Sequence, residues 1–276
     1  MVATPIGNLE DVTLRALRVL REVSLVAAED TRRTARLLQH YSISTRTTSL
    51  HEHNERSKTA SLIARLLAGE SIALVSDAGT PVVSDPGAYL VSEAHRSRIV
   101  VQPVPGPSAA IAALSASGLA KQEFVFIGFP PSRSKARQTW LAALATESRV
   151  MILYEAPHRI RPMLEDMLQA LGDRVIALGR ELTKTHENLA VRPISEHLRG
   201  PLEERGEFTI VIEGSRSQSD PAKPLPAGED LVSELGQLTE NGISSRREAI
   251  RVLAKRHGMA SNEVFRRLEQ AKNSGV

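Results

Sequence analysis

The chain has 276 residues, of which 41% are hydrophobic and 24% are charged, a balance typical of a globular protein with more than one core. It contains no cysteine, which excludes disulfide bonds and thiolate metal sites. The eight histidines show no HExxH or comparable ligand spacing, so we expect no metal. The formal net charge of +3 permits an anionic partner without requiring one.

No segment of the sequence resembles a membrane anchor or a secretory signal. The first residues lack a basic stretch followed by an apolar one. The longest apolar run, at 109–120, is interrupted by serine and glycine and is too short to span a membrane. We therefore expect a cytoplasmic protein with no membrane contact.

Short aliphatic runs alternate with amphipathic stretches up to residue 214. The runs that predict strands are 25–28, 72–76, 99–101, 124–128, 151–154, 175–179 and 208–213. The stretches with apolar residues at three- and four-residue spacing, which predict helices, include 14–23, 34–38, 61–67 and 160–171. Such alternation predicts an α/β fold with mainly parallel sheets covered by helices.

Breaks in these patterns divide the chain. The strand and helix patterns stop near 117 and restart after 122, which predicts one αβα domain at 1–117 and a second at 118–214. Residues 215–228 are polar and contain three prolines, as linkers do. The remainder, 229–276, is predicted to be a small basic helical domain.

This last segment carries an excess of positive charge. Between Gly242 and Val276 there are eight lysines and arginines against three glutamates. A basic helical appendage suits a polyanion such as RNA. A solvated helix face is the alternative explanation.

Turn-forming residues gather where predicted strands end. The clearest group is Ser76-Asp77-Ala78-Gly79-Thr80-Pro81, whose small residues let a ligand approach the backbone while Asp77 accepts hydrogen bonds. A tight capped turn explains the same residues equally well. Neither GxGxxG nor GxxxxGK[ST] occurs, which disfavours a Rossmann dinucleotide site and a P-loop.

Two arginines follow the first predicted strand at an unusual position. In Ala28-Glu29-Asp30-Thr31-Arg32-Arg33-Thr34, capping by Asp30 or Thr31 explains the start of a helix. It does not explain Arg32 and Arg33, because positive charge is unfavourable at a helix N-terminus. A phosphate or a carboxylate is the natural partner for them.

Three further polar segments lie at strand ends. Segment 51–55 contains His51 and His53, which alternate sides if extended and so are not expected to share a metal; a surface loop is the simpler explanation. Segments 154–159 and 180–187 place charges where buried strands emerge, as a cleft between domains requires.

Taken in order, these segments resemble one family, the ribosomal RNA small-subunit methyltransferase I family of the tetrapyrrole-methylase-like superfamily. The matching segments are 3–9, 28–32, 76–81, 85–87, 105–108, 154–159, 180–184 and 206–209. The family has a few residues before the segment that matches Val2 to Pro5, so we expect a shortened first strand.

The resemblance implies an activity and a mode of assembly. A methyl group would pass from S-adenosyl-L-methionine to the ribose 2′-hydroxyl of a cytidine in the decoding region of 16S rRNA, either free or in the 30S subunit. Two αβα domains would hold the cofactor in the cleft between them, and the protein would form a homodimer.

The resemblance also implies roles for individual residues. Asp30 and Glu181 are the candidate catalytic bases, while Arg32, Lys184, His53 and Arg159 would contact the substrate. The residues implied for the cofactor site are Pro5, Gly7, Asp77, Ala78, Gly79, Pro105, Gly106, Ser108, Tyr154 and Thr209. Two alternatives remain open: methylation of a tetrapyrrole or another small molecule, and a non-catalytic RNA-binding assembly module.

Overall fold

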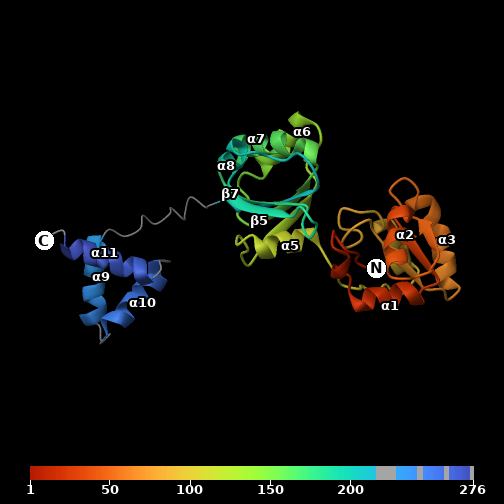
Figure 1. Ribbon diagram of the computed structural model, residues 1–276, viewed down its shortest axis with the longest axis horizontal. Helices are drawn as coiled ribbons and strands as arrows, with labels where there is room; N and C mark the ends of the chain where they lie inside the picture. Colours follow the sequence, from red (N-terminus) through yellow and green to blue (C-terminus); the bar gives the residue numbers. More distant parts are fainter. Residues whose placement is uncertain (216–227, 241–244, 258–260, 274–276) are drawn as a thin grey trace. The chain divides into compact units, whose positions relative to one another are not determined.

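The computed structural model describes residues 1–215, 228–240, 245–257 and 261–273 (Figure 1). The chain divides into two compact units, Met1–Ser215 and Arg216–Val276. Within the described residues, no helix is both long enough and apolar enough to cross a membrane. The predicted linker at 215–228 lies almost entirely outside the described residues.

The first unit contains two sheets with helices around them. Its helices, strands and two 3-10 turns (η) are, in chain order, η1 Leu9–Asp11, α1 Leu14–Glu22, β1 Leu25–Ala28, α2 Thr31–His40, β2 Thr47–Ser49, α3 Glu55–Leu67, β3 Ile72–Val75, α4 Ala88–Arg96, α5 Ala109–Ala116, β4 Phe124–Gly128, α6 Ser134–Ala143, β5 Val150–Glu155, η2 Pro157–Arg159, α7 Ile160–Leu171, β6 Val175–Arg180, β7 Asn188–Pro193, α8 Ile194–Arg199 and β8 Phe208–Ile212.

The first sheet has the order β2-β1-β3 and is parallel throughout. All four residues of β1 are buried, since the sheet is covered on both faces. Val26 and Ala28 pack with residues of α1 and α2, whereas Leu25 and Ala27 pack with residues of α3 and α4. Because β1 is central, the carboxyl ends of β1 and β3 emerge side by side.

The first four residues extend this sheet without forming a regular strand. Val2 donates its backbone N–H to the Leu74 carbonyl at 2.9 Å, and Val104 donates to Met1 at 2.8 Å. Thr4 and Gly79 exchange two backbone hydrogen bonds of 2.9 and 3.0 Å. The N-terminal segment is thereby fixed beside the loop that follows β3.

The strand predicted at 99–101 is wrong. These residues form no ladder, and the nearest pairing is the single bridge between Val2 and Val104. Pro103 and Pro105 flank Val104 and have no N–H to donate, which prevents a longer ladder there.

The second sheet has the order β4-β5-β8-β6-β7 and is mixed. Only β4 and β5 pair in parallel; the other three pairings are antiparallel, so the expectation of mainly parallel strands holds for the first sheet alone. The seven residues that join β6 to β7 are too few for a crossover helix, which forces an antiparallel hairpin.

Helices cover both faces of this second sheet (Figure 1). One core joins Met151 and Leu153 of β5 to Leu141 of α6 and to α7 and α8. The other joins Val150 and Ile152 to α5. The α/β class is therefore confirmed, and α5 belongs to the layers of the second sheet although it precedes residue 117.

The second unit consists, in its described part, of three helices: α9 Gly228–Glu240, α10 Arg246–His257 and α11 Ser261–Asn273. They bury a common core that includes Leu231, Leu253 and Leu268. The predicted small helical C-terminal unit is confirmed for these residues. Arg246 pairs with Glu269, and Arg267 with Glu263, so part of the positive charge is neutralised locally.

One ion pair is buried between α6 and α7, and its loss is expected to be costly. Arg137 contacts Asp166 at 2.6 Å with side chains 6% and 10% exposed, and Gln138 donates to the same carboxylate at 2.9 Å. Replacing Arg137 by Met leaves a buried charge poorly compensated, so the free energy of unfolding should fall by about 3–5 kcal/mol. Urea unfolding measures this change.

The double variant Arg137→Met, Asp166→Leu is the matched control. It removes both charges and should recover most of the lost stability, because an apolar pair of similar volume replaces the ion pair. A double variant as unstable as Arg137→Met alone would contradict this explanation.

Candidate functional site

The carboxyl ends of β1 and β3 are joined through Asp77. Its carboxylate accepts the backbone N–H of Asp30 at 2.9 Å and lies 3.4 Å from the Arg33 guanidinium. Its own N–H donates to Glu29 at 3.3 Å. A phosphate or a carboxylate was the expected partner of both arginines. Arg33 pairs with the Asp77 carboxylate, and Arg32 pairs with the Asp30 carboxylate at 2.8 Å. Each arginine at the start of α2 has a carboxylate from this chain.

The loop after β3 is held in an uncommon backbone conformation. Gly79 and Gly87 have positive φ angles, and so do Val82 at 74° and Ser84 at 65°. A β-branched residue with positive φ is a genuine outlier, and such strain concentrates at functional sites. The loop presents Asp85, a half-buried carboxylate, beside Asp77 and Glu29.

An aromatic pair lies across from this loop. Tyr154 at the end of β5 and Phe129 after β4 have ring centroids 5.4 Å apart, and Phe129 is 58% exposed. The Arg159 guanidinium binds the buried Glu155 at 2.7 Å and the Pro130 carbonyl at 3.0 Å. Arg159 therefore fixes the segment that carries Phe129.

The loop between β6 and β7 forms a third wall. Lys184 donates to Glu181 at 2.8 Å and to Glu207 at 3.1 Å. Gly7 packs so closely on this loop that a Cβ there would lie 2.4 Å from the Lys184 side chain. Asn8 also donates to the Thr183 hydroxyl at 3.0 Å. The N-terminal segment and the second sheet thus meet here.

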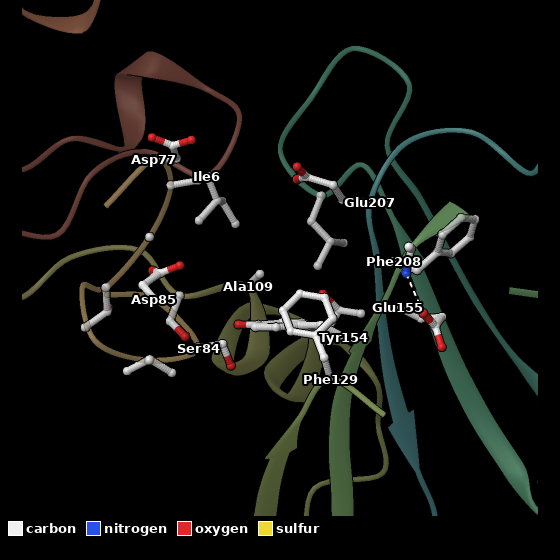
Figure 2. A pocket seen from close by; sticks show the side chains of 18 of the residues that line it. Ile6, Asp77, Ser84, Asp85, Ala109, Phe129, Tyr154, Glu155, Glu207 and Phe208 are labelled. Carbon is white, nitrogen blue, oxygen red and sulfur yellow. Dashed lines mark hydrogen bonds between the residues drawn. The ribbon is translucent and has the colours of Figure 1, made fainter. Parts of the chain in front are cut away.

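These walls enclose a cavity of about 400 Å³, called the first cavity below. This volume is within the ~300–1,000 Å³ typical of small-molecule sites. Figure 2 shows Asp77 and Asp85 on one side, Glu207 on the other, and Phe129 lying over Tyr154. The lining residues are Ile6, Glu29, Arg33, Asp77, Ala78, Gly79, Thr80, Val83, Ser84, Asp85, Ser108, Ala109, Phe129, Tyr154, Glu155, Ala156, Pro157, Leu182, Lys184, Glu207, Phe208 and Thr209.

A second cavity of about 260 Å³ adjoins the first. Its remaining wall comes from the N-terminal segment and from the first two turns of α2. The residues that line both cavities are Ile6, Arg33, Asp77, Ala78, Lys184 and Glu207. The two cavities are therefore neighbours across a shared boundary.

Two carboxyl groups of the first cavity, Asp85 and Glu29, are partly removed from water, which disfavours their charged forms. The pKa of Asp85 is raised to about 6, mainly by burial; a hydrogen bond with Ser76 opposes this shift, and the charges of the nearby Glu29 and Asp77 add to it. Burial also raises the pKa of Glu29. Closely spaced carboxylates in a partly dry cavity attract a cationic ligand.

Lys184 and Glu181 form a stable ion pair at the edge of this site. Burial alone would lower the pKa of Lys184, but hydrogen bonds to Glu181 and Glu207 outweigh it, so that the pKa is raised. Burial opposes ionisation of Glu181, yet the hydrogen bond with Lys184 leaves its pKa lowered. Both groups are charged at neutral pH.

Most residues predicted for the cofactor site line these cavities. Asp77 and Ala78 line both, and Gly79, Ser108, Tyr154 and Thr209 line the first. Pro5 and Gly7 line the second. Pro105 and Gly106 line neither; a Cβ at Gly106 would lie 2.8 Å from that of Ala3, which indicates a packing position.

The residues predicted for the substrate and for catalysis are more dispersed. Lys184 lines both cavities, whereas Asp30 and Arg32 line neither and pair with each other. Asp30 caps α2 through the Arg32 N–H. Glu181 lines a separate pocket with His186 and Arg205.

His53 and Arg159 also lie outside both cavities. His53 is exposed beside His51 on the loop before α3. Arg159 is occupied by Glu155 and Pro130, as described above. The substrate roles of these residues stay predictions.

Several cavity residues were not predicted as site residues. The cavity residues Glu29, Arg33, Asp85 and Glu207 belong to the sequence segments 28–34, 85–87 and 206–209, so their place in these motifs was an available signal. Phe129 follows β4 in a Gly-Phe-Pro-Pro segment, where the same signal applies. Among the described residues, no group of three or more histidines and carboxylates could hold a metal ion.

Comparison with known proteins assigns the chain to a family. Residues 1–197 match the family described as Tetrapyrrole (Corrin/Porphyrin) Methylases. A protein of Vibrio cholerae serotype O1 named "Ribosomal RNA small subunit methyltransferase I" is 45% identical, covering 88% of this chain and 91% of its own length. Its namesake in Escherichia coli O157:H7 is 44% identical, covering 96% and 92%.

Solved structures resemble the chain at the level of the fold. A uroporphyrin-III-C-methyltransferase from Thermus thermophilus matches with a TM-score of 0.55 and 21% identity, covering 77% of this chain and 92% of that one. A diphthine synthase matches with a TM-score of 0.61 and 15% identity, covering 77% and 88%. On the evidence of the family match and the relatives, the chain belongs to the tetrapyrrole methylase family and, within it, to the ribosomal RNA small subunit methyltransferase I proteins.

Proposed function

We propose that this protein transfers a methyl group from S-adenosyl-L-methionine to the ribose 2′-hydroxyl of a cytidine in the decoding region of 16S rRNA. The observation that carries the proposal is the first cavity, which combines an aromatic pair with three neighbouring carboxylates. The names of the relatives supply the class of acceptor. We further propose that the enzyme acts in the cytoplasm, as the sequence pattern indicates, and as a homodimer, as the resemblance implies.

The residues of the first cavity fit this methyl donor. S-adenosylmethionine is an adenosine that carries a cationic sulfonium and an amino group, and it supplies an activated methyl group. Phe129, Tyr154 and Ile6 offer apolar surface for the nucleoside part. Asp85 and Asp77 offer negative charge for the cationic part.

The acceptor hydroxyl requires alignment and a partner for its proton. Positioning provides most of the rate in such a transfer, and a general base adds a factor of about 10²–10⁴. Asp30 and Glu181 line neither cavity, whereas Asp77 and Glu207 line the boundary between the two. Their position supports Asp77 and Glu207 as the better candidates to accept the proton.

The proposal is tested by incubating the protein with labelled S-adenosylmethionine and unmodified 30S subunits, followed by mass spectrometry of the rRNA. We expect label on the ribose of a single cytidine of 16S rRNA. Label on small tetrapyrrole precursors instead would support the small-molecule alternative. Calorimetry that detected no binding of the donor would support a non-catalytic RNA-binding module.

Replacing Asp85 by Asn is expected to raise the stability of the protein and to weaken its binding of the donor. The folded protein raises the pKa of Asp85 to about 6 from an ordinary value of 3.8, so stability from its neutral form is present at low pH and lost as pH rises through 6. Above pH 6 the variant should gain ~1 kcal/mol, a value discounted for solvent screening, with little difference below pH 4. Thermal unfolding across this pH range measures the gain.

The same variant should bind S-adenosylmethionine more weakly, because it lacks a negative charge beside the cationic ligand. In the wild type, affinity should rise with pH through 6, and Asp85→Asn should flatten this dependence. Calorimetric titrations between pH 5 and pH 8 provide the comparison. A pH profile identical to the wild type would remove Asp85 from the donor site.

The second unit offers two arginines for RNA contact. Arg247 and Arg251 are exposed, stand one helical turn apart on α10, and form no ion pair among the described residues. Replacing both by Gln should weaken 30S binding and reduce the slope of log affinity against log salt by roughly one to two. Donor affinity should not change, and equal salt slopes for variant and wild type would argue against this contact.

A further inference from the structure

We propose that the second cavity receives the nucleotide to be methylated, and that Arg36 is the residue that binds its phosphate. This inference rests on the proposed function and deepens it. It assigns the first cavity to the donor and the second to the acceptor. Nothing in the sequence motifs had singled out Arg36.

The two cavities have the arrangement that a transfer between two ligands requires. They share the boundary formed by Ile6, Arg33, Asp77 and Ala78 on one side and by Lys184 and Glu207 on the other. Groups bound in the two cavities would therefore meet at carboxylates that are able to accept a proton. A ligand confined to the first cavity would leave the second without a role.

The size and the lining of the second cavity suit one nucleotide. Its volume of about 260 Å³ is slightly below the ~300–1,000 Å³ of typical small-molecule sites and cannot accommodate a double helix. Thr4, Thr34 and Ser76 provide hydroxyl groups, while Leu9 and Leu37 provide apolar surface. An RNA nucleotide turned out of its stack presents a sugar, a base and a phosphate to such a surface.

The positive charges of the second cavity are not equivalent. Arg33 lies 3.4 Å from the Asp77 carboxylate, and Lys184 binds both Glu181 and Glu207. Arg36 lines the cavity, is exposed, and has no ion pair among the residues that the structure describes. Its guanidinium is thus the cation of this wall that is available to a phosphate, and it can bind one through two parallel hydrogen bonds.

The test compares the full-length variant Arg36→Gln with the wild type, using unmodified 30S subunits as probe. We expect KM and Kd for 30S to rise about tenfold, the loss typical of one charged hydrogen-bonded contact. The rate kcat and the affinity for S-adenosylmethionine should stay within about twofold of the wild type. The slope of log affinity against log salt should fall by about one.

Two further variants complete the experiment. Arg36→Lys keeps the charge and should retain the salt slope while it recovers part of the affinity, because a lysine binds phosphate as a point charge. Arg15→Gln removes an exposed arginine on α1 that lines neither cavity, and it should behave as the wild type.

The outcomes separate this inference from the proposed function. One outcome is that the wild type transfers the methyl group and that Arg36→Gln has the same KM and Kd for 30S as the wild type or Arg15→Gln. This result would overturn the assignment of Arg36 and leave the proposed function intact. If the wild type bound 30S but transferred no methyl group, the function would fail, while a tenfold effect of Arg36→Gln on binding would still support the phosphate site. Absence of both binding and transfer would overturn both proposals.

Discussion

The site depends on the way Asp77 connects two strand ends. Parallel pairing of β1 with β3 brings Glu29, Asp30 and Asp77 together. The Asp77 carboxylate accepts the backbone N–H of Asp30, and the Asp77 N–H donates to the Glu29 carboxylate. Arg33 then pairs with Asp77 and brings the start of α2 to the same point. Both cavities border on Asp77, so the donor wall and the acceptor wall of the proposed reaction are built from one set of contacts.

The charge at this point has a cost for folding. Asp85, Asp77 and Glu29 repel each other in a partly dry cavity, and the positive φ angles of Val82 and Ser84 add backbone strain. Strained and mutually repelling groups persist only where the surrounding structure holds them in place. Here the Thr4–Gly79 backbone pairing and the buried cores on both faces of the first sheet provide that support. A cationic ligand would relieve part of the repulsion.

The second sheet contributes the apolar half of the site. Register between β5 and β8 places Tyr154 opposite Thr209, and both line the first cavity. Arg159 fixes the segment of Phe129 through Glu155, an ion pair whose acid is fully buried. The contrast between an acidic wall and an aromatic wall supports the proposal that the cavity binds a cationic nucleoside.

The sequence predicted the elements whose pattern is strong and local. The strands β1, β3, β5, β6 and β8 are continuous apolar runs, so they were recognisable. In contrast, β2 is a polar Thr-Thr-Ser segment and β7 is a half-exposed edge strand, and neither carries the hydrophobic signal. The mixed order β4-β5-β8-β6-β7 depends on pairings between distant segments, which periodicity does not specify.

The same limit applies to the site. The family resemblance implied Asp77, Gly79, Ser108, Tyr154 and Thr209 for the cofactor, and all of them line the first cavity. The sequence did not show which strand ends are neighbours. Asp85 therefore appeared only within the segment 85–87, Phe129 received no role, and Asp30 and Glu181 were the predicted bases, with no role given to Glu207. No signal in the sequence indicated Arg36, because its position depends on the packing of α2 against the second cavity.

The assignment of the first cavity to the methyl donor is the central claim. Its most direct test is a crystal structure of the protein with S-adenosylhomocysteine, the demethylated form of the donor. We expect electron density for this ligand in the first cavity, between Asp85 and the Phe129–Tyr154 pair. Density in the second cavity alone, or outside both cavities, would contradict it.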